Sequence, residues 1–127
     1  AQLPRMTFIV AADGSKGLHL VAELADGWVT LGRESPDIEA WWQSVADVSH
    51  RLDDLLSEHG RDAGSLDRYL NLAAHRYVLE SVDAWEDAVG HAAVLGFTDV
   101  VTHWPRTEGA YAGSEKILAE VASRFSR

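Results

Sequence analysis

The stretch AADGSKGLHLVAELADGWVTLG, residues 11–32, joins a small apolar run to a helical pattern and then to a second apolar run. Two glycines and a lysine stand in DGSKG, at 13–17, where the first run gives way to the helix. The apolar residues between Leu18 and Leu24 recur at steps of three and four, and the pattern stops at Asp26-Gly27, a common signal for a helix end. The stretch therefore predicts a strand, a glycine-rich turn, a helix and a second strand.

The same plan recurs along the chain. Most of the apolar runs lack strict alternation, which is typical of strands buried on both faces in a parallel sheet. Each run is followed by a helical pattern, so we expect four strand–helix units with right-handed connections. The four predicted strands are 7–12, 28–32, 68–74 and 99–104.

The helices carry recognisable boundary signals. Ser35 is the expected N-cap of the second helix, with Pro36 at its first helical position and Gly60 at its end. The third helical pattern runs from Ser81 to Gly96, and the last holds Ile117, Leu118, Val121 and Phe125 at helical spacing.

Two architectures fit four such units in one domain spanning residues 1–127. A small doubly wound sheet places helices on both faces, whereas consecutive units that curl one way form half of an eight-stranded (β/α)8 barrel. A complete barrel needs about 250 residues, and this chain has 127. The pattern alone leaves both architectures open.

Composition excludes several classes of function. The 11 Lys and Arg residues against 20 Asp and Glu give a net charge of −9, and no basic cluster is present, so we expect no nucleic-acid or anionic membrane partner. The chain has no cysteine, and its six histidines lack metal-ligand spacing, so we expect no metal site. No apolar run approaches the roughly 18 residues of a membrane helix. We expect a soluble, cytoplasmic protein.

The DGSKG turn suits an anion. In a parallel sheet the loops after the strands face the functional crevice, and each following helix begins with unpaired N–H groups. The glycines would allow close approach of a ligand, Ser15 can donate a hydrogen bond, and Lys16 adds a positive charge, so a phosphate is the natural ligand. The alternative is a tight turn followed by a solvated lysine, because short glycine motifs are weak signals.

Longer motifs resemble a known family. The segment FIVAADGSKGLHLVAELADGWVTLG resembles the pattern small-small-x-Gly-x-Lys/Arg-x-Leu-x-Leu-Ala-x-x-x-Ala-Asp-Gly-Trp of the luciferase-like flavin-dependent oxidoreductases. HRLDDLLSEHGRDAGSLDRYLNL is similar to the family's helix that ends in Gly-Arg-Asp, and SVDAWEDAVGHAAVLGFTDVVTHWPR is similar to its last crossover. The resemblance covers nearly the whole chain, and its most specific elements are 25–28 and 60–62.

The resemblance implies a TIM barrel that binds FMN or a deazaflavin coenzyme, whose reduced form reacts with oxygen or exchanges a hydride with a small organic substrate. The four units correspond to strands five to eight, the C-terminal half of that barrel. The family's first four strands are absent from this sequence, so the resemblance implies either a homo-oligomer or a missing N-terminal half-barrel as partner. It assigns no catalytic side chain, because the flavin carries the redox step and the protein orients it.

The resemblance also implies which residues hold the coenzyme. The DGSKG loop matches the phosphate side, the end of the second strand gives weaker candidates, and the end of the last strand faces the coenzyme mouth. The family often has proline where Ser15 stands, and His75 with Arg76 occupies an analogous loop. The predicted coenzyme contacts are Gly14, Ser15, Lys16, Gly17, Thr30, Gly32, His103 and Arg106.

Structural roles are expected for several other conspicuous residues. Asp26 and Asp62 are interpreted as turn residues at the stability end of the sheet. One ring of the Trp41-Trp42 pair is expected to be wedged against the sheet and the other partly exposed. A packed histidine and a solvated arginine are the alternative roles of His103 and Arg106.

A second function hypothesis comes from the sheet itself. Four units with helices on one side leave an apolar sheet face and two open strand edges, which soluble proteins must cover. The chain is then a catalytically silent half-barrel that pairs with a copy of itself.

Overall fold

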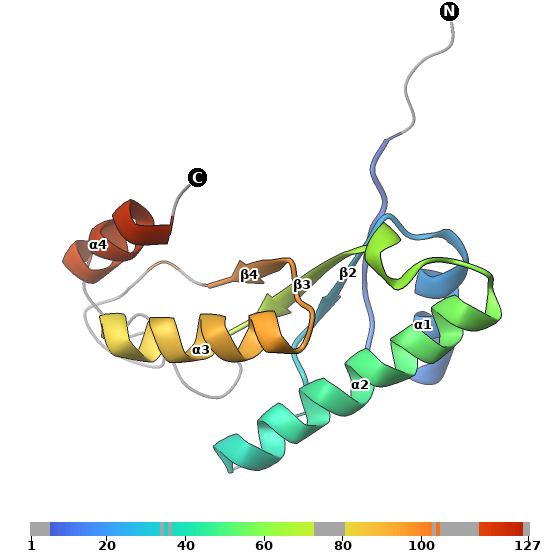
Figure 1. The fold of residues 1–127 in the computed structure, drawn as a ribbon, viewed down its shortest axis with the longest axis horizontal. Helices are drawn as coiled ribbons and strands as arrows, with labels where there is room; N and C mark the ends of the chain where they lie inside the picture. Colours follow the sequence, from blue (N-terminus) through green and yellow to red (C-terminus); the bar gives the residue numbers. More distant parts are fainter. Residues whose placement is uncertain are drawn as a thin grey trace, which may run out of the picture.

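The computed structural model describes residues 6–33, 35, 37–72, 81–102, 104 and 115–125. Strands and helices alternate along the chain, with one short 3-10 helix before the third strand (Figure 1). The elements are β1 (Ile9–Ala11), α1 (Ser15–Leu24), β2 (Gly27–Thr30), α2 (Ile38–Glu58), η1 (Ala63–Ser65), β3 (Asp67–Asn71), α3 (Val82–Val94), β4 (Asp99–Val101) and α4 (Glu115–Phe125). The four predicted strands are confirmed, and β2 and β3 each begin one residue before the predicted range, at Gly27 and Asp67.

The strands form one parallel sheet in the order β1-β2-β3-β4. Trp28 of β2 is paired with Val10 of β1 on one side and with Arg68 of β3 on the other. Since all four strands run the same way, their carboxyl ends lie at one edge of the sheet. The prediction of an α/β fold with a parallel sheet is confirmed.

One face of the sheet carries the hydrophobic core. The strand residues that point to this face are buried together with the apolar faces of the helices. Figure 1 shows α1 beside α2 and α3 beside α4. The core includes Ala12, Leu18, Val21, Trp28, Trp41, Val45, Leu52, Leu56, Leu70, Trp85, Ala92 and Val121. All four described helices therefore contribute to a core on one face.

The opposite face of the sheet is less covered and carries exposed apolar side chains together with the polar Asp67, Asn71 and Asp99. Successive strand residues point to opposite faces, and Ile9 and Val101, which point away from the core, are 46% and 38% exposed. A Cβ on Gly27 would lie 3.1 Å from Ile9 Cγ1 and 3.2 Å from Tyr69 Cε2, so these neighbouring strands bring their side chains together on this face. Leu31, which follows β2, is 50% exposed.

A consecutive strand order with helices on one face occurs in an arc of a βα barrel and in one half of a doubly wound sheet. The described elements contain no reversal of strand order, which is where a doubly wound sheet changes direction. The fold class is therefore a parallel α/β sheet built from consecutive strand–helix units.

The start of α2 differs from the prediction. Its N-cap is Asp37, whose carboxylate accepts a hydrogen bond from the Glu39 N–H at 3.2 Å, and the helix begins at Ile38. Ser35, the expected cap, lies before the helix, and its hydroxyl accepts from the Asp37 N–H at 3.3 Å. Ser35 thus shapes the turn that leads into the helix, and a carboxylate closer to the first turn caps it.

Candidate functional site

The turn between β1 and α1 lies at the carboxyl edge of the sheet. β1 ends at Ala11, Gly14 is the N-cap of α1, and the helix begins at Ser15. The segment after β2 lies at the same edge, because the two strands are parallel neighbours. Six of the eight predicted coenzyme contacts therefore lie at this edge, four of them in Gly14 and the first turn of α1, and two, Thr30 and Gly32, at and after the end of β2.

The first turn of α1 has free donors. Gly14 provides no side-chain cap, and its carbonyl accepts the first helical hydrogen bond from the Leu18 N–H at 3.0 Å. The N–H groups of the first turn then have no acceptor within the helix. By contrast, Asp37 caps α2 and the Ser81 hydroxyl caps α3.

The first turn of α1 favours an anion, whereas the Asp13 carboxylate before Gly14 carries the opposite charge to Lys16. Ser15 and Lys16 are both exposed, and the first turn of α1 contains no acidic residue. The positive end of the helix dipole and the Lys16 ammonium therefore act in the same direction.

Gly14 and Gly17 are glycines for different structural reasons. A Cβ on Gly14 would meet nothing within 4 Å, so the space beside this residue is open. A Cβ on Gly17 would lie 2.7 Å from the Ala12 Cβ, which is too close for two carbon atoms. Gly17 is thus required for the close contact of α1 with the end of β1, while Gly14 leaves room for a ligand.

Thr30 is buried at the end of β2 and bound on two sides. Its hydroxyl donates to the Asp13 carboxylate and accepts from the Gly32 N–H at 3.0 Å. The indole N–H of Trp28, two residues earlier on β2, donates to the Ala12 carbonyl at 2.7 Å. The polar groups at the end of β2 therefore bind the β1–α1 turn.

Gly32 supports the packing of α2. Its φ is +70°, a conformation that favours glycine, and an added Cβ would lie 2.7 Å from Trp41 Nε1 and 2.8 Å from Val45 Cγ2. The Trp41 indole N–H donates to the Leu31 carbonyl at 2.9 Å. Coenzyme contact by Thr30 and Gly32 stays a prediction, and both residues already have partners within the chain.

The remaining predicted contacts, His103 and Arg106, lie outside the described residues, as do His75 and Arg76. Their roles stay predictions. The hydroxyl of Thr102, the residue before His103, is buried and has no hydrogen-bond partner among the described residues.

Arg33 is a second cation at the carboxyl edge that the sequence analysis did not single out. It follows Gly32 directly, and its N–H donates to the Ser44 hydroxyl at 2.9 Å. A shallow cavity of about 300 Å³ is lined by Arg33, Ser44 and Asp47, among others. The position of Arg33 directly after Gly32, a predicted coenzyme contact, was the signal that could have identified this arginine.

The opposite edge of the sheet has structural carboxylates, as the sequence predicted. Asp26 accepts from the Phe8 N–H at 2.7 Å and so ties the start of β2 to the residue before β1. Asp62 accepts from the Gly64 N–H at 2.9 Å and caps η1. Both carboxylates hold turns in place.

A buried arginine was missed by the sequence analysis. The Arg68 guanidinium, in β3, contacts Asp53 Oδ1 at 2.5 Å and donates to the Ser49 hydroxyl at 3.1 Å. Both partners are on α2, so the network attaches this helix to the sheet. A charged residue within the otherwise apolar run RYLNL was the available signal.

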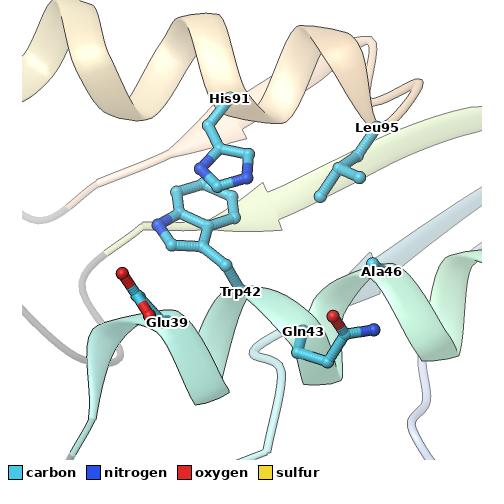
Figure 2. A pocket seen from close by; sticks show the side chains of 6 residues that line it. All are labelled: Glu39, Trp42, Gln43, Ala46, His91 and Leu95. Carbon is cyan, nitrogen blue, oxygen red and sulfur yellow. The ribbon is translucent and has the colours of Figure 1, made fainter.

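A groove lies between α2 and α3 (Figure 2). Its volume is about 320 Å³, and Trp42 and His91 form one wall by stacking their rings at 3.9 Å. Trp41 is buried and meets Trp42 at a ring-centroid distance of 4.7 Å. The prediction of one wedged and one partly exposed tryptophan ring is confirmed, whereas the partner His91 was not predicted.

The described parts of the chain offer neither a metal centre nor a membrane span. No group of three or more His, Asp or Glu side chains there has metal-binding geometry. No helix among these residues combines the length and apolar character needed to span a bilayer.

No protein-family model and no curated protein matches the sequence. Among solved structures, the chain is similar to one titled "Crystal structure of DmoA from Hyphomicrobium sulfonivorans", with a TM-score of 0.43 and 16% identity. The match covers 68% of this chain and 17% of that one, so this chain spans a small part of the length of DmoA.

Proposed function

We propose that this chain is part of a luciferase-like oxidoreductase that uses FMN or a deazaflavin coenzyme, and that its β1–α1 turn holds the phosphate side. The observation that carries the proposal is the uncapped first turn of α1 beside Lys16, at the carboxyl edge of the sheet. The sequence motifs around the same turn support the flavin family, and the turn geometry supports an anionic ligand.

The residues of the turn fit a phosphate group. First-turn N–H groups donate to its oxygens, the Ser15 hydroxyl adds a donor, and the Lys16 ammonium balances its charge. Nothing lies within 4 Å of a Cβ added to Gly14, so the space beside this residue is open to the group. When bound, the coenzyme supplies the redox chemistry, while this half of the site anchors and orients it.

The consecutive units are proposed as strands five to eight of a (β/α)8 barrel. The strand order and the helices on one face support this assignment. In such a barrel, binding loops lie at the carboxyl ends of the strands, where the β1–α1 turn is found. His103 and Arg106 are proposed to contact the coenzyme or the organic substrate from the end of the last strand.

Titration with FMN and with a deazaflavin tests the proposal. We expect Lys16→Gln to weaken binding about tenfold, because a hydrogen bond to a charged group contributes roughly 1.5–3 kcal/mol and tenfold corresponds to about 1.4 kcal/mol. Lys116→Gln, on α4, removes the same charge elsewhere and serves as the control. Equal affinities of Lys16→Gln and the unsubstituted chain would contradict the proposed phosphate site.

A second candidate function is self-association of a catalytically silent half-barrel. The exposed apolar side chains of Ile9 and Val101 on the less covered face of the sheet favour it. Native mass spectrometry in the presence of coenzyme separates the candidates. Two chains with bound coenzyme support a rebuilt site, and two chains without it support the silent module. A single chain that exposes no dye-binding apolar surface contradicts self-association.

A further inference from the structure

Two side chains of β2 donate hydrogen bonds to the residues that lead into α1. Trp28 holds the carbonyl of Ala12, and Thr30 holds the side chain of Asp13. These are the two residues directly before Gly14, the N-cap of α1. The position of the helix start is therefore set by side chains of the neighbouring strand.

The Thr30 hydroxyl is fully used by these contacts. A hydroxyl group has one proton to donate, and that of Thr30 goes to the Asp13 carboxylate. The hydroxyl oxygen accepts from the Gly32 N–H, and the residue is 1% exposed. Thr30 thus cannot donate to a ligand while its bond to Asp13 is intact.

The Asp13 carboxylate stands close to a turn that favours anions, where a negative charge would repel a phosphate. Its hydrogen bond with Thr30 gives this carboxylate a structural role instead of a role in binding the ligand. The carboxylate accepts the hydroxyl proton and fixes the turn. A neutral amide with its oxygen in the same place accepts the same proton through a weaker bond and keeps the turn in position without the negative charge.

We propose that Asp13 and Thr30 are a positioning pair, which holds the β1–α1 turn so that the first-turn N–H groups of α1 face the ligand. The sequence did not predict this contact, because it indicated Thr30 as a weaker coenzyme contact and Asp13 only as part of a turn. The link to ligand binding rests on the proposed function, whereas the fixing of the turn does not.

The test compares paired variants. Asp13→Ala removes the acceptor and Thr30→Val removes the donor, while Asp13→Asn and Thr30→Ser each retain the contact. Ser65→Ala is the control, because it removes a hydroxyl that donates to the Asp62 carbonyl at the opposite edge of the sheet. Asp13 is exposed, so the Asp13 variants remain informative even if Thr30→Val fails to fold.

The first readout needs no ligand. Hydrogen exchange of the Leu18 amide, which bonds to the Gly14 carbonyl, reports whether the first helical turn is held. We expect about tenfold faster exchange in Asp13→Ala and Thr30→Val, and rates within about twofold of the parent chain in Asp13→Asn, Thr30→Ser and the control. Unchanged Leu18 exchange in both disruptive variants would overturn the inference.

The second readout is the affinity for FMN and for inorganic phosphate. We expect Asp13→Ala and Thr30→Val to weaken binding about tenfold, with Asp13→Asn equal to the parent chain or tighter. An Asp13→Asn affinity as low as that of Asp13→Ala would overturn the inference, because charge and not position would then matter. If the parent chain binds neither probe, the proposed function fails, and the Leu18 exchange rates still decide whether the pair fixes the turn.

Discussion

The imidazole ring of His91 on α3 lies flat against the indole ring of Trp42 on α2, with centroids 3.9 Å apart and planes 18° apart. The two helices belong to different strand–helix units, so the stack adds a side-chain contact between units whose strands lie in the same sheet. Stacked rings of this kind contribute beyond the area they bury.

The contribution of this stack is measurable. We expect His91→Ala to lower the free energy of unfolding by about 0.5–1.5 kcal/mol, the range for aromatic pairs, in urea denaturation. His50→Ala is the matched control, because His50 is exposed on α2 and its replacement should change stability by less than about 0.5 kcal/mol. Equal losses in the two variants would show that the stack adds nothing.

Arg68 is expected to be one of the most sensitive polar residues. Its side chain is 5% exposed and that of its partner Asp53 is 43% exposed, so solvent screens one end of the pair. Arg68→Met leaves the Ser49 hydroxyl and the Asp53 carboxylate without their donor, and we expect a loss of about 2–4 kcal/mol in unfolding free energy. Arg51→Met, at an exposed position on α2, should stay within about 0.5 kcal/mol. A loss below about 1 kcal/mol for Arg68→Met would contradict a structural role for the network.

Periodicity predicted the units of the fold because burial on one face repeats along a strand or a helix. The four strands follow from such local signals, as do the ends of α2 and α3, each of which lies two residues before a glycine of positive φ, Gly60 and Gly96. The N-cap of α2 lies two residues after the predicted one. Ser35 and Asp37 are both good N-cap residues, and the conformation of the turn, which the sequence pattern does not indicate, decides which of them caps the helix.

The candidate site was predictable only in part. The DGSKG turn is a local motif and lies where the strand order placed it. The bonds that hold it join Asp13 to Thr30 and Ala12 to Trp28, residues 16 or 17 positions apart, and no repeat in the sequence marks them. Gly32 was read as a ligand contact, yet its neighbours are the side chains of Trp41 and Val45 on the next helix.

Gly14 and Gly17 should respond differently to the same substitution. Gly14→Ala adds a methyl group in open space, so we expect a change of less than about 0.5 kcal/mol in unfolding free energy together with weaker FMN binding. Gly17→Ala pushes a methyl group against Ala12, and we expect a loss of about 1–3 kcal/mol from overpacking. Urea denaturation and FMN titration of both variants check this. Stability lost at Gly14 and kept at Gly17 would contradict the packing of the turn.

Gly32 and Gly60 form a matched pair, because their φ values are +70° and +69°. Alanine at either position meets the same left-handed strain of about 1–2 kcal/mol. At Gly60 nothing lies within 4 Å of the added Cβ, whereas at Gly32 it meets Trp41 and Val45. We therefore expect Gly32→Ala to lose about 1–3 kcal/mol more than Gly60→Ala in chemical denaturation. Equal losses would mean that α2 shifts to make room.

The less covered face of the sheet is tested by placing a charge on it. Val101→Asp puts a carboxylate on β4 at a position that points away from the core, and we expect it to lower the fraction of self-associated chain about tenfold in sedimentation, since burying an unpaired charge is unfavourable. Val94→Asp is the control, because Val94 is 85% exposed on α3 and lies on the helical side of the sheet. If association survives Val101→Asp and is lost with Val94→Asp, the chains meet through their helices, and the sheet face must be covered in another way.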